Sequence, residues 1–455
     1  MRRFIALLII MSLLLVSCGT TPAPSDDSDD RTPADDTTPP EPVNPDEPDA
    51  QPEPDSQPEP DSQPEPDVPD DQPQPIDPDD QPKPVFPDEE PEDTRTYTEI
   101  LLSQMTLEEK VGQLFLIRPD SLDPSLTPDQ VHETSLYGRT EASSSMLETL
   151  KKYPAGGIVY FGKNLVGPNT LKKYMDSLSS VSGIPLLYAV DEEGGIVSRI
   201  AQIDAFGVEN IGYMANIGAT GDIGKAYAAG QYIGSYLSSL DLKLDFAPVA
   251  DINTNPNNIV IGKRAFGSDP ALVSSMVGSF LDGLHSEETI GCTKHFPGHG
   301  DTSADTHEDY VSVMKTWDQL KEAELIPFVE NFEKTDMIMI AHLTLPKITS
   351  DGLPASLSKE LVTGKLRNEL GYEGLITTDA LAMGAIAKNY SSAEAAVLAF
   401  DAGIDILLMP YDYVEAFDGV VEAVKSGRIS EDRLDESVLR ILNLKYQYGL
   451  LQENQ

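Results

Sequence analysis

Short apolar runs alternate with longer amphipathic stretches along residues 96–455. Segments such as Ala393–Ala402 and Arg433–Tyr446 repeat apolar residues at helical spacing. Eight runs of four to six residues have the length of buried parallel strands: Gln113–Ile117, Gly157–Phe161, Leu186–Val190, Leu244–Val249, Ile290–Thr293, Met337–Ile340, Leu375–Thr378 and Ile406–Met409. Eight alternating strand and helix units predict an α/β fold, a TIM-type (β/α)₈ barrel.

Polar residues lie directly behind these apolar runs. Asp191 follows the third run and Asp251 follows the fourth. The polar stretch 294–301 follows the fifth run, His342 the sixth and Asp379 the seventh. Because the carboxyl ends of the strands meet at the face where such barrels place their active sites, this pattern predicts an enzyme.

The densest group of ionisable residues follows the fifth run and has two interpretations. In the first, it binds a divalent metal ion through oxygen and nitrogen ligands. In the second, Asp305 fixes the tautomer of the nearby His307, which then transfers protons near neutral pH. The prolines and glycines of this segment make it a loop, and the chain has no His-Glu-x-x-His motif. The candidate metal ligands are His295, His299, Asp301, Asp305 and His307.

Asp379 follows an apolar run without an intervening turn, so we expect its carboxylate to project from the end of a strand. A carboxylate in that place can attack an anomeric carbon. It can equally be the N-cap of the next helix. The residues alone do not separate these two roles.

Several motifs resemble, in order, those of bacterial β-N-acetylglucosaminidases of glycoside hydrolase family 3. The most specific is Lys294-His-Phe-Pro-Gly-His-Gly-Asp-Thr302 followed by Asp305-Thr-His307, and the similarity extends from about Tyr97 to Leu450. The other matching segments are Val190–Gly195, Phe246–Val249, Arg264–Pro270, Pro354–Ser358 and Thr377–Leu381.

The resemblance implies a retaining hydrolase that acts on N-acetylglucosamine-containing carbohydrate without a cofactor. It implies that Asp379 forms a covalent glycosyl-enzyme. It also implies that His307, oriented by Asp305, protonates the leaving oxygen and then activates water. The sugar contacts of the family fall on Asp191, Arg199, Arg264, Lys294 and His295.

Two features depart from the family pattern. Glu192 stands where the family commonly has glutamine, and Ile196 stands where it commonly has arginine, which changes the charge expected at the pocket rim. Glu192 and Glu193 are the reserve candidates for the catalytic acid. The chain stops without the additional domain of many β-glucosidases, which favours the histidine-dependent branch. The competing hypotheses are a metal-dependent barrel hydrolase and a non-catalytic sugar-binding lipoprotein.

The N-terminus is typical of an exported lipoprotein. Residues 1–17 contain two arginines and then an apolar run of about 13 residues, too short for a membrane-spanning helix, so we predict a signal peptide. Leu15-Val16-Ser17-Cys18 resembles a lipobox, in which Cys18 is lipidated. The mature chain then keeps Cys292 as its single further cysteine and forms no internal disulfide.

Residues 18–95 are rich in proline and acidic residues. Between Gly19 and Arg95 there are 26 acidic and three basic residues, about half of the net charge of −44 of the chain. Such a segment buries too little apolar surface to fold, so we predict an extended linker that holds a catalytic domain, residues 96–455, away from a cell membrane. We expect an extracytoplasmic, lipid-anchored monomer, and the acidic composition argues against binding to nucleic acid.

Overall fold

The computed structural model describes residues 94–133, 138–302 and 311–453. These residues belong to one compact unit. The predicted signal peptide, the predicted lipidation site Cys18 and nearly all of the predicted linker lie outside the described residues, as do Asp305 and His307. The boundaries predicted at residues 17 and 95 therefore stay predictions.

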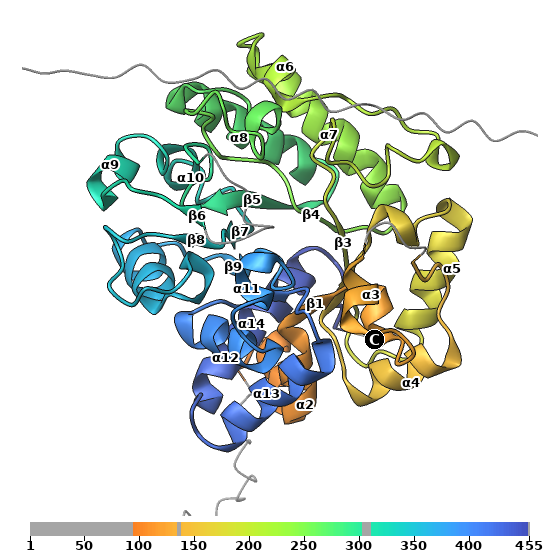
Figure 1. Ribbon diagram of the computed structural model, residues 1–455. Helices are drawn as coiled ribbons and strands as arrows, with labels where there is room; N and C mark the ends of the chain where they lie inside the picture. The colour runs from red at the N-terminus through yellow and green to blue at the C-terminus, as the bar shows by residue number, and fades with distance from the viewer. Residues whose placement is uncertain (1–93, 134–137, 303–310, 454–455) are drawn as a thin grey trace, which may run out of the picture. The chain divides into compact units, whose positions relative to one another are not determined.

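Eight parallel strands form a barrel at the centre of the domain (Figure 1). Their order is β10-β1-β2-β3-β4-β5-β7-β9, and Thr377 of β9 pairs in parallel with Ile406, directly before β10, which closes the sheet on itself. The strands are β1 Phe115–Ile117, β2 Gly157–Val159, β3 Leu187–Val190, β4 Leu244–Asp245, β5 Ile290–Phe296, β7 Met337–Ile340, β9 Leu375–Thr378 and β10 Leu407–Leu408.

Each of the eight predicted strands is present in the barrel, so the predicted fold class is confirmed. β7 and β9 have the predicted bounds, whereas β4 and β10 have only two residues each. β5 continues beyond the predicted end to Phe296, which pairs with Ile340 of β7 after a shift in register. The sequence did not predict β6 (Val311–Ser312) and β8 (Leu343–Thr344), a separate parallel pair too short to show a strand pattern.

Helices surround the barrel on its outside (Figure 1). The α-helices are α1 Tyr97–Gln104, α2 Leu107–Gln113, α3 Pro128–His132, α4 Ser144–Lys152, α5 Pro168–Ser179, α6 Met214–Gly218, α7 Ile223–Ser239, α8 Pro270–His285, α9 Trp317–Lys321, α10 Ile326–Val329, α11 Gly384–Ala387, α12 Ser392–Ala402, α13 Tyr413–Lys425 and α14 Glu431–Gln447. A π-helix, η6, spans Glu360–Glu369, and short 3₁₀ turns are η1 Pro119–Leu122, η2 Gly162–Asn164, η3 Asp204–Phe206, η4 Gly262–Arg264 and η5 Ala355–Leu357.

Local sequence explains where several of these elements begin and end. Thr96 and Thr106 each cap a helix through a reciprocal bond with a glutamate three residues later. Gly403 ends α12 with a φ of 113°, a backbone conformation that other residues rarely adopt. All four residues of β7 are buried, as expected for a strand covered on both faces. Among the described residues, no helix is both long and apolar enough to span a bilayer.

Candidate active site

Asp379 and the five predicted sugar contacts line a single cavity of about 540 Å³, together with the further candidates Glu193 and His299. The cavity lies at the carboxyl ends of the strands: Asp191 follows β3 directly, and Asp379 follows β9. Strands far apart in the sequence thus bring these side chains together. The six residues are Asp191, Arg199, Arg264, Lys294, His295 and Asp379.

Asp379 is held by the backbone around it. Its N–H donates to the carbonyl of Ile340 at 2.9 Å, and its Oδ1 accepts a hydrogen bond from the N–H of Ala380 at 2.7 Å. The next helix, α11, begins at Gly384 with Met383 as its N-cap. Asp379 is therefore not the N-cap of α11, and the interpretation of this aspartate as a helix N-cap is wrong.

Four side chains form a charged wall of the cavity: Asp191, Glu193, Arg264 and Lys294. Lys294 lies at its centre. Its side chain is only 2 % exposed, and its Nζ lies 2.9 Å from Oδ1 of Asp191 and 2.6 Å from Oε1 of Glu193. Burial alone would lower the pKa of Lys294, but the two carboxylates outweigh burial and raise it above its usual range. Lys294 is therefore a permanent cation with a fixed position.

Arg264 forms the second half of this wall. Its Nε and Nη2 donate to the two oxygens of Glu193 at 2.8 and 2.7 Å, a bidentate pair, and its Nη2 lies 3.3 Å from Nε2 of His295. Burial would raise the pKa of Glu193, but Arg264 and Lys294 hold it far below its usual range. Glu193 therefore stays ionised, and it is a poor candidate for a general acid.

Glu192 does not lie at the pocket rim, contrary to expectation. Its side chain is fully buried, and it accepts hydrogen bonds from three consecutive backbone N–H groups and from the hydroxyl of Tyr236. Its charge is thus used to fix the loop after β3 and is not presented to a ligand. Ile196, the other departure from the family pattern, is 65 % exposed.

Arg118 and Phe161 are among the cavity residues that were not predicted from the sequence. The guanidinium of Arg118 lies 3.9 Å from the ring centroid of Phe161, and that of Arg199 lies 5.0 Å from the same ring. Nη2 of Arg199 also lies 3.5 Å from Oδ2 of Asp191. Arg118 directly follows the predicted strand Gln113–Ile117, and Phe161 is the last residue of the predicted strand Gly157–Phe161. This position at the carboxyl end of a strand is the signal that would have identified them.

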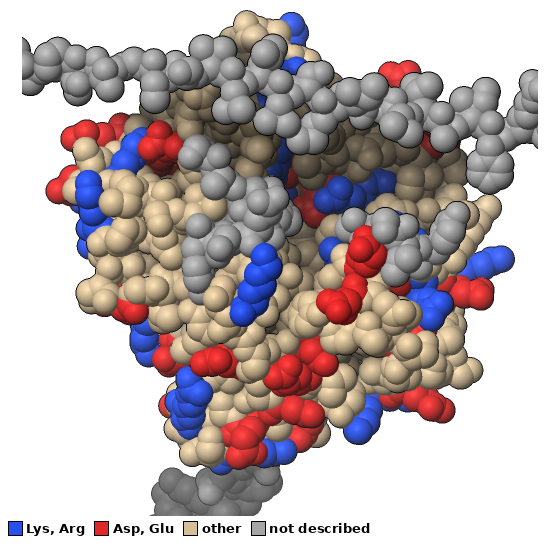
Figure 2. All heavy atoms as spheres, in the orientation of Figure 1, with Lys and Arg blue, Asp and Glu red and all other residues tan. Residues whose placement is uncertain are grey.

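Charges of both signs therefore alternate along the cavity wall. In the space-filling view, acidic and basic side chains are likewise interspersed on the face shown (Figure 2). Among the described residues, no group of three or more histidine, cysteine, aspartate and glutamate side chains could hold a metal ion. Two of the five candidate metal ligands, Asp305 and His307, lie outside that part of the chain.

Comparison with known proteins places the chain in a family. The profile of the Glycosyl hydrolase family 3 N terminal domain matches residues 106–444. The chain belongs to glycosyl hydrolase family 3. The family resemblance predicted from the ordered motifs is thereby confirmed.

Relatives of this family 3 protein include named hexosaminidases. It is 32 % identical over 336 residues to Beta-hexosaminidase A of Pseudoalteromonas piscicida, covering 67 % of this chain but only 56 % of that relative. It is 30 % identical over 352 residues to Beta-hexosaminidase LpqI of Mycobacterium tuberculosis, covering 72 % of this chain and 85 % of the relative. The solved structure of a family 3 β-N-acetylglucosaminidase from Paenibacillus is 38 % identical, with a TM-score of 0.69, covering 76 % of this chain and 63 % of the other.

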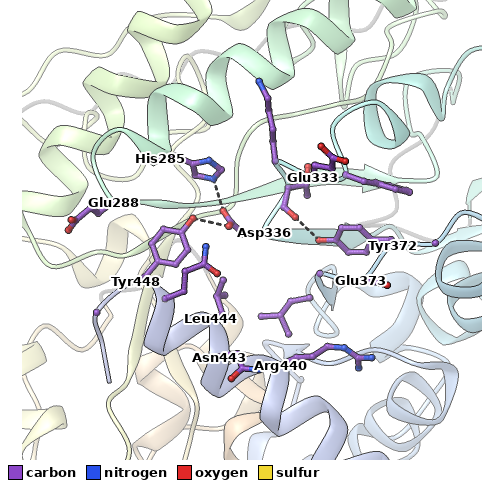
Figure 3. A pocket seen from close by; sticks show the side chains of 18 residues that line it. His285, Glu288, Glu333, Asp336, Tyr372, Glu373, Arg440, Asn443, Leu444 and Tyr448 are labelled. Atoms are coloured by element: carbon purple, nitrogen blue, oxygen red, sulfur yellow. Dashed lines mark hydrogen bonds and ion pairs between the residues drawn. The ribbon is translucent and has the colours of Figure 1, made fainter. Parts of the chain in front are cut away.

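The family 3 domain has a second, larger hollow of about 990 Å³ (Figure 3). It lies at the opposite end of the barrel, since its lining residues Asp336 and Gly374 directly precede β7 and β9. There Asp336, which precedes β7, accepts hydrogen bonds from Nε2 of His285, from the hydroxyl of Tyr448 and from the N–H of Gly291, at 2.8, 2.8 and 3.0 Å. Both oxygens of this carboxylate are therefore occupied in tying α8, β7 and the end of α14 together. The cluster is structural, and the smaller cavity at the carboxyl ends is the candidate active site.

Proposed function

We propose that this family 3 protein is a retaining exo-β-N-acetylglucosaminidase that removes terminal β-linked N-acetylglucosamine from cell-wall fragments or chito-oligosaccharides. The observation that carries the proposal is that Asp379 shares one cavity with all five predicted sugar contacts. The similarity to hexosaminidases and to the Paenibacillus β-N-acetylglucosaminidase supports the same substrate class.

In the proposed reaction, a carboxylate oxygen of Asp379 attacks the anomeric carbon while the bond to the leaving oxygen breaks. His307, oriented by Asp305, gives its proton to that oxygen. In the second step water attacks the glycosyl-enzyme, and His307 takes a proton from this water. The sugar then leaves with its β-configuration retained, and Asp379 is regenerated as a carboxylate.

The charged wall supports recognition of a sugar. Lys294 and Arg264 can donate hydrogen bonds to hydroxyls and to the acetamido oxygen, and Asp191 can accept hydrogen bonds from hydroxyls. Ion pairs between 2.6 and 2.9 Å, of Lys294 with Asp191 and Glu193 and of Arg264 with Glu193, hold these groups in place before a ligand binds. Such preorganised dipoles and charges stabilise a transition state without further rearrangement. The cavity volume of about 540 Å³ lies within the range usual for small-ligand sites.

We further propose that the enzyme acts as an extracytoplasmic monomer anchored to the cell membrane through lipid on Cys18. The lipobox-like sequence before Cys18 and the acidic, proline-rich segment after it support this proposal. A diacylglyceryl group holds a protein at a bilayer more firmly than a single acyl chain.

Hydrolysis of a panel of chromogenic β-glycosides tests the proposed activity. We expect turnover of the N-acetylglucosaminide in preference to the glucoside and the xyloside, and we expect it to survive dialysis against a chelator. Asp379→Asn should lower turnover by at least about a thousandfold. The exposed Asp418, on the outer helix α13, gives the matched control Asp418→Asn, which should keep wild-type activity.

Turnover of none of these glycosides would overturn the proposed substrate class. Loss of activity on chelation would instead favour the metal-dependent hydrolase. Near-wild-type activity in a folded Asp379→Asn protein would remove Asp379 from the mechanism.

A further inference from the structure

Asp251 is a fully buried aspartate behind the cavity wall, in the loop that follows β4. It does not line the cavity itself. Its Oδ2 accepts hydrogen bonds from Nδ1 of His295 at 2.7 Å and from the backbone N–H of His295 at 3.2 Å, and its Oδ1 accepts from the backbone N–H of His299 at 2.6 Å. One carboxylate thus holds both ends of the turn between the two histidines.

The partners of His295 determine which of its ring nitrogens carries the proton. Arg264 has only donors, and its Nη2 lies 3.3 Å from Nε2 of His295, so Nε2 must accept. The proton of the neutral ring therefore lies on Nδ1 and is donated to Asp251. Burial would raise the pKa of Asp251, but His295 and the backbone N–H of His299 outweigh burial and keep it below its usual range, so the carboxylate is a pure acceptor.

We propose that Asp251 is a positioning residue that fixes the Nδ1–H tautomer of His295 and, through it, the place of Arg264 in the sugar-binding wall. The proposal deepens the function proposed above and rests on it. Asp251 acts entirely through other side chains. Arg264 in turn forms the bidentate pair with Glu193, so a change in the tautomer of His295 would also displace the side chains of the cavity wall.

Asp251→Asn is the sharpest perturbation, because it keeps the shape and removes one acceptor. If the amide oxygen faces His295, the NH₂ group faces the backbone N–H of His299, and two donors meet. If the NH₂ group faces His295, the ring proton must move to Nε2, where it meets the donor of Arg264. Either orientation leaves one pair of donors without an acceptor, so the variant cannot reproduce the wild-type arrangement.

Two measurements on the full chain test this inference. We expect Asp251→Asn to lower kcat/KM for the chromogenic N-acetylglucosaminide by about 10- to 100-fold, mainly through a higher KM, while the matched variant Asp418→Asn stays within twofold of the wild type. The tautomers are read by NMR of protein labelled with ¹⁵N-histidine, since the chain has only six histidines. The resonances of His295 are assigned by their absence in His295→Gln.

The wild type should show the Nδ1–H tautomer at His295, and Asp251→Asn should show Nε2–H or a mixture. An Nε2–H tautomer in the wild type would overturn the inference even if the variant did not fold. A fall in kcat/KM with an unchanged tautomer would assign Asp251 a purely structural role. The NMR result needs no substrate, so it stands apart from the proposed function, which fails only if the wild type cleaves no β-N-acetylglucosaminide.

Discussion

Replacing Glu192 by glutamine tests how the loop after β3 is held, because the change keeps the size of the side chain and removes its charge. In the wild type, Oε2 accepts hydrogen bonds from the N–H groups of Arg199 and Ile200 at 2.5 and 2.9 Å. Oε1 accepts hydrogen bonds from the N–H of Ala201 and the hydroxyl of Tyr236 at 3.0 and 2.9 Å. Each carboxylate oxygen thus has two donors.

A glutamine side chain has one acceptor oxygen and one donor group. In either orientation its NH₂ group faces at least one backbone N–H, and a buried donor without an acceptor costs about 1–3 kcal/mol. The bonds that remain lose the assistance of the negative charge, which removes roughly another 1 kcal/mol. We therefore expect Glu192→Gln to lower the free energy of unfolding by about 2–4 kcal/mol.

The assay is urea unfolding of the wild type, of Glu192→Gln and of Glu148→Gln. Glu148 is an exposed residue of α4, so its variant should unfold within about 0.5 kcal/mol of the wild type. Because Arg199 belongs to this loop and lines the cavity, Glu192→Gln should also raise KM. If Glu192→Gln unfolded like the wild type, the carboxylate would not hold the loop, and the reasoning from its four donors would be wrong.

Three further predictions concern Lys445, His285 and Cys18. The buried Lys445 donates to three oxygen acceptors, and burial lowers its pKa to about 7. Above that pH the unfolded chain binds more protons at this residue than the folded protein does. The free energy of unfolding of the wild type should therefore rise between pH 7 and 10 relative to that of Lys445→Met. Burial alone would lower the pKa of His285, but the hydrogen bond and charge of Asp336 outweigh burial and raise it. The free energy of unfolding that is lost in His285→Gln should therefore be greatest below about pH 6.5 and should fade as the pH rises. An equal loss at pH 5 and pH 9 would contradict this. Cys18→Ala should leave the membrane fraction or fail to mature, and a normally processed variant that stays with membranes would exclude the lipid anchor.

The barrel could be predicted because each of its strands carries its own signal. A buried parallel strand is apolar on both faces, and β7 follows this rule over its whole length, whereas β9 is buried throughout but ends in Thr377 and Thr378. β4 and β10 also have only two residues each, but they lie within the predicted apolar runs Leu244–Val249 and Ile406–Met409, whereas β6 and β8 lie in no such run. The positions of Asp191 and Asp379, each directly after a strand, were also enough to predict that both line one cavity.

The roles of individual carboxylates could not be predicted in the same way. Asp191, Glu192 and Glu193 are consecutive in the sequence, yet only the first and the third line the cavity, while the second points into the protein. The direction of each side chain depends on partners that come from other strands and helices, such as Lys294 and Tyr236. Such distant pairings leave no local pattern in the sequence.

The most direct test of the account is to trap the glycosyl-enzyme. His307→Ala, given an N-acetylglucosaminide with a good leaving group, should complete the first step and then wait for a base, so the intermediate should accumulate. Mass spectrometry of the intact protein and of its peptides should find one added N-acetylglucosaminyl group on the peptide that contains Asp379. An adduct on another residue, or product of inverted configuration with no adduct at all, would contradict the account.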